Sequence, residues 1–102
     1  MFYANAARFT EEAIALVDVP EPPRWFILLA NAVDDVDYTG GKTLVELAEQ
    51  LKQRDVTFAV ADVRAAVRPE LDRFGLTEAI GEEHIFATLE DAIASFRASK
   101  PS

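Results

Sequence analysis

The stretch "WFILLANAVDDVDYTGGKTLVELAEQLKQRDVTFAVADV", residues 25–63, decides the fold. It opens on a nearly continuous apolar run of strand length and closes on a second short, β-branched apolar run at 56–63. Such runs are typical of strands that are covered on both faces. Between them, Leu44, Leu47, Ala48 and Leu51 recur at helical spacing and predict a helix over about 40–54. Strand, helix and strand in this order predict two parallel strands joined by a right-handed crossover.

The flanking segments continue the alternation. Apolar spacing predicts a helix over 7–17, and the proline-rich segment "DVPEPPRW" connects it to the first buried strand. A shorter helix over 66–74 stops at Gly75, and "HIFAT" at 84–88 is either an edge-like strand or a connector. Thr88 and Asp91 form an approximate capping box for a last helix. With a short strand at 2–4, the prediction is an α/β fold, a mainly parallel sheet flanked by about four helices.

Size and composition limit the class of protein. At 102 residues we expect a single domain over 1–98 with a frayed tail at 99–102. The net charge of -8 argues against nucleic-acid binding, since the surface repels polyanions. The chain has no cysteine, its one histidine, His84, has no Ser or Cys partner suggested by spacing, and we find no cofactor fingerprint. We therefore expect no enzyme and no resident cofactor or metal.

The turn "DDVDYTGGKT" at 34–43 follows the first buried strand, where open α/β sheets gather their ligands. A phosphate-binding P-loop is disfavoured because Val36 stands where the first glycine is required and because the nearby carboxylates repel phosphate. Asp34, Asp35 and Asp37 could hold a divalent cation, but acids ahead of a helix more simply offset its dipole.

Thr39 is the residue of most interest in this turn. Its hydroxyl is predicted to cap the second helix, next to a flexible Gly-Gly pair. The rival interpretation is a regulated phosphorylation site, which would place further negative charge beside Asp37 and change a docking surface more than the fold. Both interpretations stay open at this point.

Arginine supplies the local excess of positive charge downstream, at Arg64, Arg68 and Arg73. Arg64 follows the second buried strand and should lie on the same rim as the turn, where it could receive an anion or an acidic partner. The candidate binding residues are Asp37, Tyr38, Thr39, Gly40, Gly41, Lys42 and Arg64.

Three stretches resemble the STAS domain, a module of SulP-type sulphate transporters and of anti-sigma factor antagonists. They are "FYANAARF" at 2–9, "DDVDYTGGKTLVELAEQLKQRDV" at 34–56 and "VRPELDRFGLTEAIGEEHIFATLEDAI" at 67–93. The opening stretch and the turn resemble the transporter-linked branch more than the antagonists. The resemblance also implies one or two earlier strands that this chain lacks, and it aligns Thr39 with the phosphorylatable serine of the antagonists.

The resemblance implies a non-catalytic regulatory domain at the cytoplasmic face of an anion transporter. Its partner would be the transporter's membrane domain, a regulatory protein or a second copy, met through the turn at 37–42. One alternative is a stand-alone anti-sigma factor antagonist switched by phosphorylation of Thr39. The other is a sensor domain that binds a nucleotide weakly, or a small anion, on the amides of the second helix, helped by Lys42 and Arg64.

Overall fold

The computed structural model describes residues 6–30 and 38–99 of the 102-residue chain. Its elements are, in order, α1 (Ala6–Val17), β1 (Trp25–Leu29), α2 (Tyr38–Gln53), β2 (Thr57–Ala61), α3 (Arg68–Arg73), α4 (Leu76–Ile80), the 3-10 helix η1 (Glu82–His84) and α5 (Leu89–Ala98). Helices therefore alternate with strands in the first half and dominate the second half.

The two strands pair in parallel, with Trp25 opposite Thr57 and Leu29 opposite Ala61. The N–H of Thr57 donates to Arg24 O at 2.8 Å, and the N–H of Ala30 donates to Ala61 O at 2.9 Å. Because α2 connects the strands, the predicted strand-helix-strand unit is confirmed.

The other predicted strands have different outcomes. Ile85 makes one isolated parallel bridge to Val60, so within the described residues "HIFAT" is a connector that touches the sheet rather than a strand. The predicted strand at 2–4, and the end of the first buried run at 31–33, lie outside the described residues.

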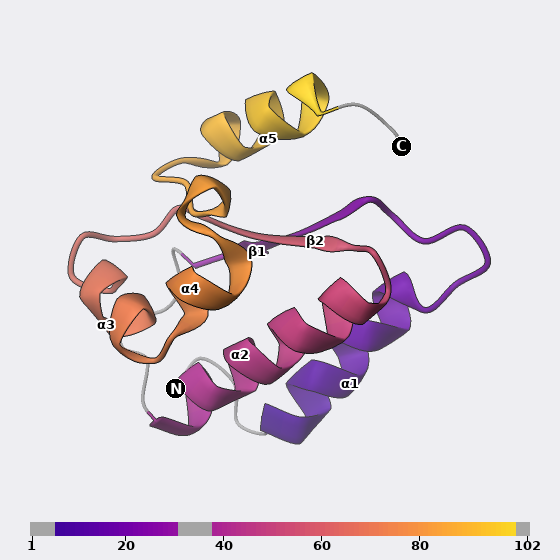
Figure 1. Cartoon of the computed structure of the whole chain (residues 1–102), viewed down its shortest axis with the longest axis horizontal. Coiled ribbons are helices and arrows are strands. Elements are labelled where there is room, and N and C mark those ends of the chain that lie inside the picture. The colour runs from indigo at the N-terminus through magenta and orange to yellow at the C-terminus, as the bar shows by residue number, and fades with distance from the viewer. Residues whose placement is uncertain (1–5, 31–37, 100–102) are drawn as a thin grey trace.

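The core lies between the strand pair and α2. Helix α5 covers one face of the pair, while α1 and α2 lie on the other and α3 and α4 pack at the side (Figure 1). On β1, Phe26 and Leu28 pack against the core, whereas Trp25 meets Phe96 of α5. This alternation follows from the two-residue period of a strand. The largest fully buried side chains are Leu47, Leu51, Leu76, Val17, Val60 and Val67.

The predicted helix over 66–74 corresponds to α3, and α4 and η1 follow it, so the described residues contain five α-helices rather than about four. Gly75 has φ of 85°, a left-handed conformation that ends α3 and redirects the chain. Leu76 then starts α4 and is fully buried. The predicted stop at Gly75 is confirmed, but the new helix after it was not foreseen.

Candidate functional site

The rim predicted from the sequence is built from two segments. Helix α2 follows β1, and the loop with Arg64 follows β2, so both continue from the carboxyl ends of neighbouring parallel strands. The fold thus places the start of α2 and Arg64 at one edge of the sheet. Asp37, like Asp34 and Asp35, lies outside the described residues, and its part in the site stays a prediction.

Thr39 does not occupy the cap position that the sequence suggested. Helix α2 begins at Tyr38, so the backbone of Thr39 belongs to the first turn of the helix. The expectation of a cap at Thr39 is therefore wrong, because the helix extends two residues further toward the N-terminus than the apolar periodicity indicates. The phosphorylation hypothesis is untouched by this correction.

Gly41 has a packing role in the structure, whereas the sequence suggested that Gly40 and Gly41 form a flexible pair. It is buried in α2, and a Cβ added there would lie 2.6 Å from Cδ2 of Phe74 and 2.9 Å from its Cβ. A contact this short is not tolerated, so the absence of a side chain at Gly41 lets α2 approach the end of α3. The start of α2 is therefore closely packed on one side.

Lys42 and Thr43 point in different directions from this packed turn. Lys42 is exposed, whereas Thr43 is buried at 8% exposure and has a polar partner. The first turns of α2 therefore present a cation to the outside while their inner face is closed.

The basic cluster is not a free anion site. Arg68 Nε lies 3.3 Å from Asp72 Oδ1, and its Nη2 lies 3.3 Å from Glu82 Oε1. The guanidinium of Arg73 lies 5.2 Å from the ring centre of Phe74. Arg64 is exposed, has a partner of its own, and its carbonyl accepts the N–H of Val67 and of Arg68. Of the three arginines, Arg64 is the one that follows the carboxyl end of β2, so it stays the candidate for the rim.

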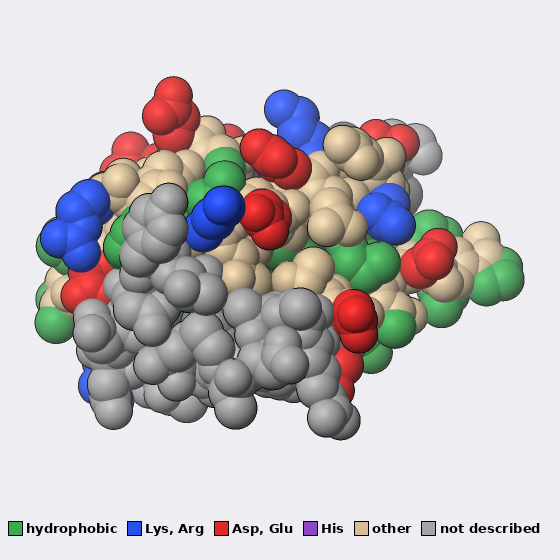
Figure 2. Space-filling view, turned by 90° about the horizontal axis from the view of Figure 1, so that it is seen from below, with side chains coloured by type: hydrophobic (Ala, Val, Ile, Leu, Met, Phe, Trp, Pro, Cys, Tyr) green, Lys and Arg blue, Asp and Glu red, His purple; other side chains and the backbone are tan. Residues whose placement is uncertain are grey.

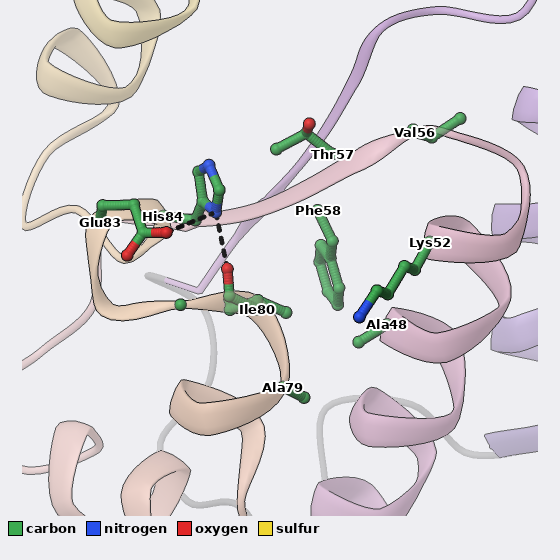
Figure 3. A pocket seen from close by; sticks show the side chains of 10 residues that line it. Ala48, Lys52, Val56, Thr57, Phe58, Ala79, Ile80, Glu83 and His84 are labelled. Atoms are coloured by element: carbon green, nitrogen blue, oxygen red, sulfur yellow. Dashed lines mark hydrogen bonds and ion pairs between the residues drawn. The ribbon is translucent and has the colours of Figure 1, made fainter.

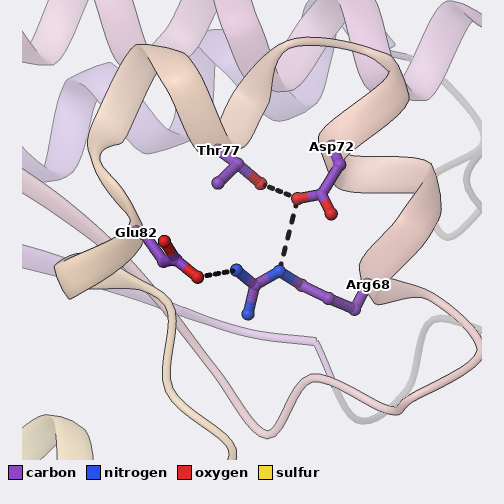
Figure 4. A network of polar contacts seen from close by, with 4 residues as sticks. All are labelled: Arg68, Asp72, Thr77 and Glu82. Atoms are coloured by element: carbon purple, nitrogen blue, oxygen red, sulfur yellow. Dashed lines mark hydrogen bonds and ion pairs between the residues drawn. The ribbon is translucent and has the colours of Figure 1, made fainter.

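The contacts of Arg68 belong to a polar network that joins three helices (Figure 4). The hydroxyl of Thr77 in α4 donates to Asp72 Oδ1 of α3, the same oxygen that Arg68 contacts. The Thr77 hydroxyl, followed by Arg68, lowers the pKa of Asp72 below its usual 3.8. Glu82 ties η1 to the same guanidinium. The network fixes the α3–α4–η1 segment rather than a ligand.

His84 is partly exposed and makes specific contacts. Its Nδ1 lies 2.6 Å from Ile80 O, so this nitrogen carries the proton and donates. The imidazole meets Trp25 edge to face, with centroids 5.5 Å apart. These contacts connect η1 to β1 and to the aromatic cluster under α5.

Asp62 is a residue that the sequence reasoning missed. It follows β2 with φ of 58°, and its Oδ1 accepts the N–H of Leu89 at 3.0 Å. Leu89 is the first residue of α5, and Thr88 caps this helix, as predicted, because its side chain accepts the N–H of Asp91 at 3.1 Å. An Asp directly after a buried strand was the available signal, since Asp tolerates the left-handed region better than most residues.

The described residues hold no group of three or more His, Cys, Asp or Glu side chains that could bind a metal ion. Within the same part of the chain, none of the helices has the length and apolar character to cross a bilayer. The face seen from the side of α1 and α2 carries Lys and Arg scattered among Asp and Glu (Figure 2).

Comparison with known proteins identifies the family of this arrangement. The STAS domain family matches residues 1–92. The chain belongs to the STAS domain family. A probable sulfate transporter of Mycobacterium tuberculosis is 38% identical over 96 residues, which are 93% of this chain and 17% of that protein. The STAS chain thus spans only a small part of that relative's length.

Solved structures show the same fold. A sulfate transporter family protein from Wolinella succinogenes superposes with a TM-score of 0.79 at 29% identity, covering 90% of this STAS chain and 76% of that one. The STAS domain of a SulP transporter from Vibrio cholerae gives a TM-score of 0.80 at 23% identity, covering 97% and 78%. The predicted α/β STAS-like fold is confirmed.

Proposed function

We propose that this STAS domain is a non-catalytic regulatory domain of a SulP-type anion transporter, at the cytoplasmic face of the membrane. The observation that carries the proposal is the family match over most of the chain, together with relatives that are named as sulfate transporters. The matched relatives are far longer than the domain, which fits a module attached to a larger membrane protein.

The docking surface in this proposal is the strand-to-helix turn at 37–42. Two features of the described residues support it. Lys42 is exposed, and the packing of Gly41 against Phe74 holds the start of α2 against α3. A cation on a firmly packed helix start suits an acidic surface of the membrane domain, because the backbone loses little freedom on docking.

The test reverses the charge of Lys42 in the transporter polypeptide that carries this domain. We expect Lys42→Glu to change sulphate uptake by about three-fold or more, because a rim charge pair is replaced by repulsion. Arg97→Glu is the matched control, since Arg97 is exposed on α5 and makes the same charge change. Uptake is measured per molecule of transporter in the membrane. Equal uptake for wild type and Lys42→Glu would contradict the proposal that the turn at 37–42 is the docking surface.

A broader experiment tests the regulatory role itself. Deletion of the domain from the transporter should alter uptake while the membrane domain still reaches the membrane. Unchanged uptake after deletion would contradict any regulatory function. The antagonist alternative is tested by incubation with an anti-sigma type kinase and ATP, followed by mass analysis for a phosphate on Thr39. The sensor alternative is tested by calorimetric titration with GTP, ATP, sulphate and bicarbonate.

A further inference from the structure

A pocket of about 350 Å³ lies beside the C-terminal half of α2, away from the start of that helix. Its walls come from the C-terminal half of α2, the amino end of β2 and the α4–η1 segment (Figure 3). The volume lies at the lower end of the range for small-molecule sites. The carboxyl ends of the strands, where the proposed docking turn lies, do not contribute to it.

One side of the pocket is apolar. Ala48 of α2, Phe58 of β2, and Ala79 and Ile80 of α4 line it. Phe58 is only 4% exposed, and its ring packs against Phe26 with centroids 5.9 Å apart, so this wall is held in place. The wall suits a compact aromatic or aliphatic group, which gains roughly 25 cal/mol for each Å² it removes from water.

Lys52 supplies a positive charge beside this wall. Its amino group lies next to the Phe58 ring and Ala48 in Figure 3. Within the described residues, the amino group of Lys52 makes no ion pair or hydrogen bond. A lysine that lines a pocket without a carboxylate partner is available to an anionic ligand.

The edge of β2 adds a backbone donor. Thr57 donates to Arg24 and Ala61 accepts from Ala30, so the odd-numbered residues of β2 bond to β1. The N–H and C=O of Phe58 therefore point to the other edge, where Ile85 pairs only with Val60. In the described residues, neither group of Phe58 has a hydrogen-bond partner.

Glu83 limits the charge that the pocket accepts. Its carboxylate lines the same pocket and its side chain is 74% exposed, 3.9 Å from Nδ1 of His84. A ligand with two negative charges would meet repulsion from Glu83 while gaining only one cation in Lys52. One negative charge on an apolar body fits the lining better than an inorganic dianion does.

We propose that this pocket binds a small organic monocarboxylate. The carboxylate bonds to Lys52 Nζ and to the N–H of Phe58, and the apolar body rests on Phe58 and Ile80. The site is separate from the docking turn, because it lies at the amino end of β2 and at the other end of α2. The inference does not depend on the proposed transporter function.

The experiment titrates the 102-residue chain with benzoate and with hexanoate, followed by amide NMR. We expect saturable shifts in residues 48–58 and 79–84, with neutral benzamide and inorganic sulphate giving much weaker ones. Lys52→Met keeps the aliphatic stem and should weaken benzoate binding by about five-fold, the scale of one charge-assisted contact. Glu83→Gln should strengthen binding by about two-fold.

Arg97→Met is the matched control, because Arg97 is an exposed cation on α5 that does not line the pocket, so its loss should leave the affinity unchanged. Circular dichroism verifies that each variant is folded. Equal benzoate affinity in wild type and Lys52→Met would overturn the assignment. So would the lack of saturable shifts with both carboxylates at concentrations up to about 20 mM.

Discussion

Gly41 occupies a position where the neighbouring ring of Phe74 leaves no room for a side chain. In an exposed helix, Gly→Ala would stabilise by about 1 kcal/mol through backbone entropy. Here the new methyl group would overlap the ring of Phe74, and overpacking costs about 1–3 kcal/mol. The steric term wins, so Gly41 is kept by packing rather than by flexibility.

We expect Gly41→Ala to lower the free energy of unfolding by about 1–2 kcal/mol in urea titrations. Phe74→Ala removes the whole ring, including the Cδ2 atom that the methyl group would meet. In that background Gly41→Ala should cost clearly less, which a double-mutant cycle measures as coupling between the two sites. Additive effects in the cycle would contradict the packing explanation.

Asp72 gives a pH-dependent prediction. Its pKa is lowered in the folded state, mainly by the Thr77 hydroxyl, so its stabilising contribution is complete above the unfolded value near 3.8. That contribution is lost as the pH falls below 3.8 through the folded pKa. Thr77→Val should bring the pKa of Asp72 back toward 3.8 in an NMR titration of the carboxyl group. Thr77→Ser keeps the hydroxyl and should preserve the shift, and a low pKa in the valine variant would argue against this cause.

At the level of elements, α5 is attached to the sheet at both ends. Asp62 holds the start of the helix through Leu89, and Arg24 donates to Ser99 Oγ at 3.1 Å at the other end. Arg24 also lies over the ring of Phe96, 4.6 Å from its centre. Because α5 is short, these attachments, rather than helix propensity, hold it on the strands.

Replacing Asp62 should loosen the beginning of α5. Asp62→Ala removes the acceptor for Leu89 and puts a less tolerant residue in the left-handed region, so we expect a loss of about 1–2 kcal/mol in urea unfolding. Asp62→Asn keeps an acceptor oxygen and tolerates the left-handed region, so it should change the free energy of unfolding little. Amide hydrogen exchange at 89–92 should accelerate in the alanine variant alone. Equal exchange in the two variants would show that Asp62 does not anchor the helix.

At the scale of the whole molecule, the parallel strand pair and the helices on both faces could be predicted, because apolar periodicity reports which faces are buried. The new helix that begins at Leu76, directly after the predicted stop at Gly75, could not, since it depends on a buried place for the Leu76 side chain. The helix start at Tyr38 was also missed, because polar residues there carry no periodic signal.

The candidate site was predictable only in outline. The rim position of the α2 start and of Arg64 follows from strand order alone. The ion pair between Arg68 and Glu82, which are fourteen positions apart, could not be predicted, because it depends on how α3, α4 and η1 fold back. The pocket at Lys52 is equally hidden, since its walls come from three separated segments.

The parallel pairing of β1 and β2 also bears on how the chain folds. The contact between Trp25 and Thr57 closes a long connection that contains the whole of α2. Closing that long connection costs chain entropy before any strand contact forms, so we expect α2 and the strand pair to share the rate-limiting step. Leu47→Ala should therefore slow refolding in stopped-flow measurements, whereas Phe96→Ala on α5 should mainly speed unfolding. If Phe96→Ala slowed refolding and Leu47→Ala mainly sped unfolding, α5 would instead belong to the folding nucleus.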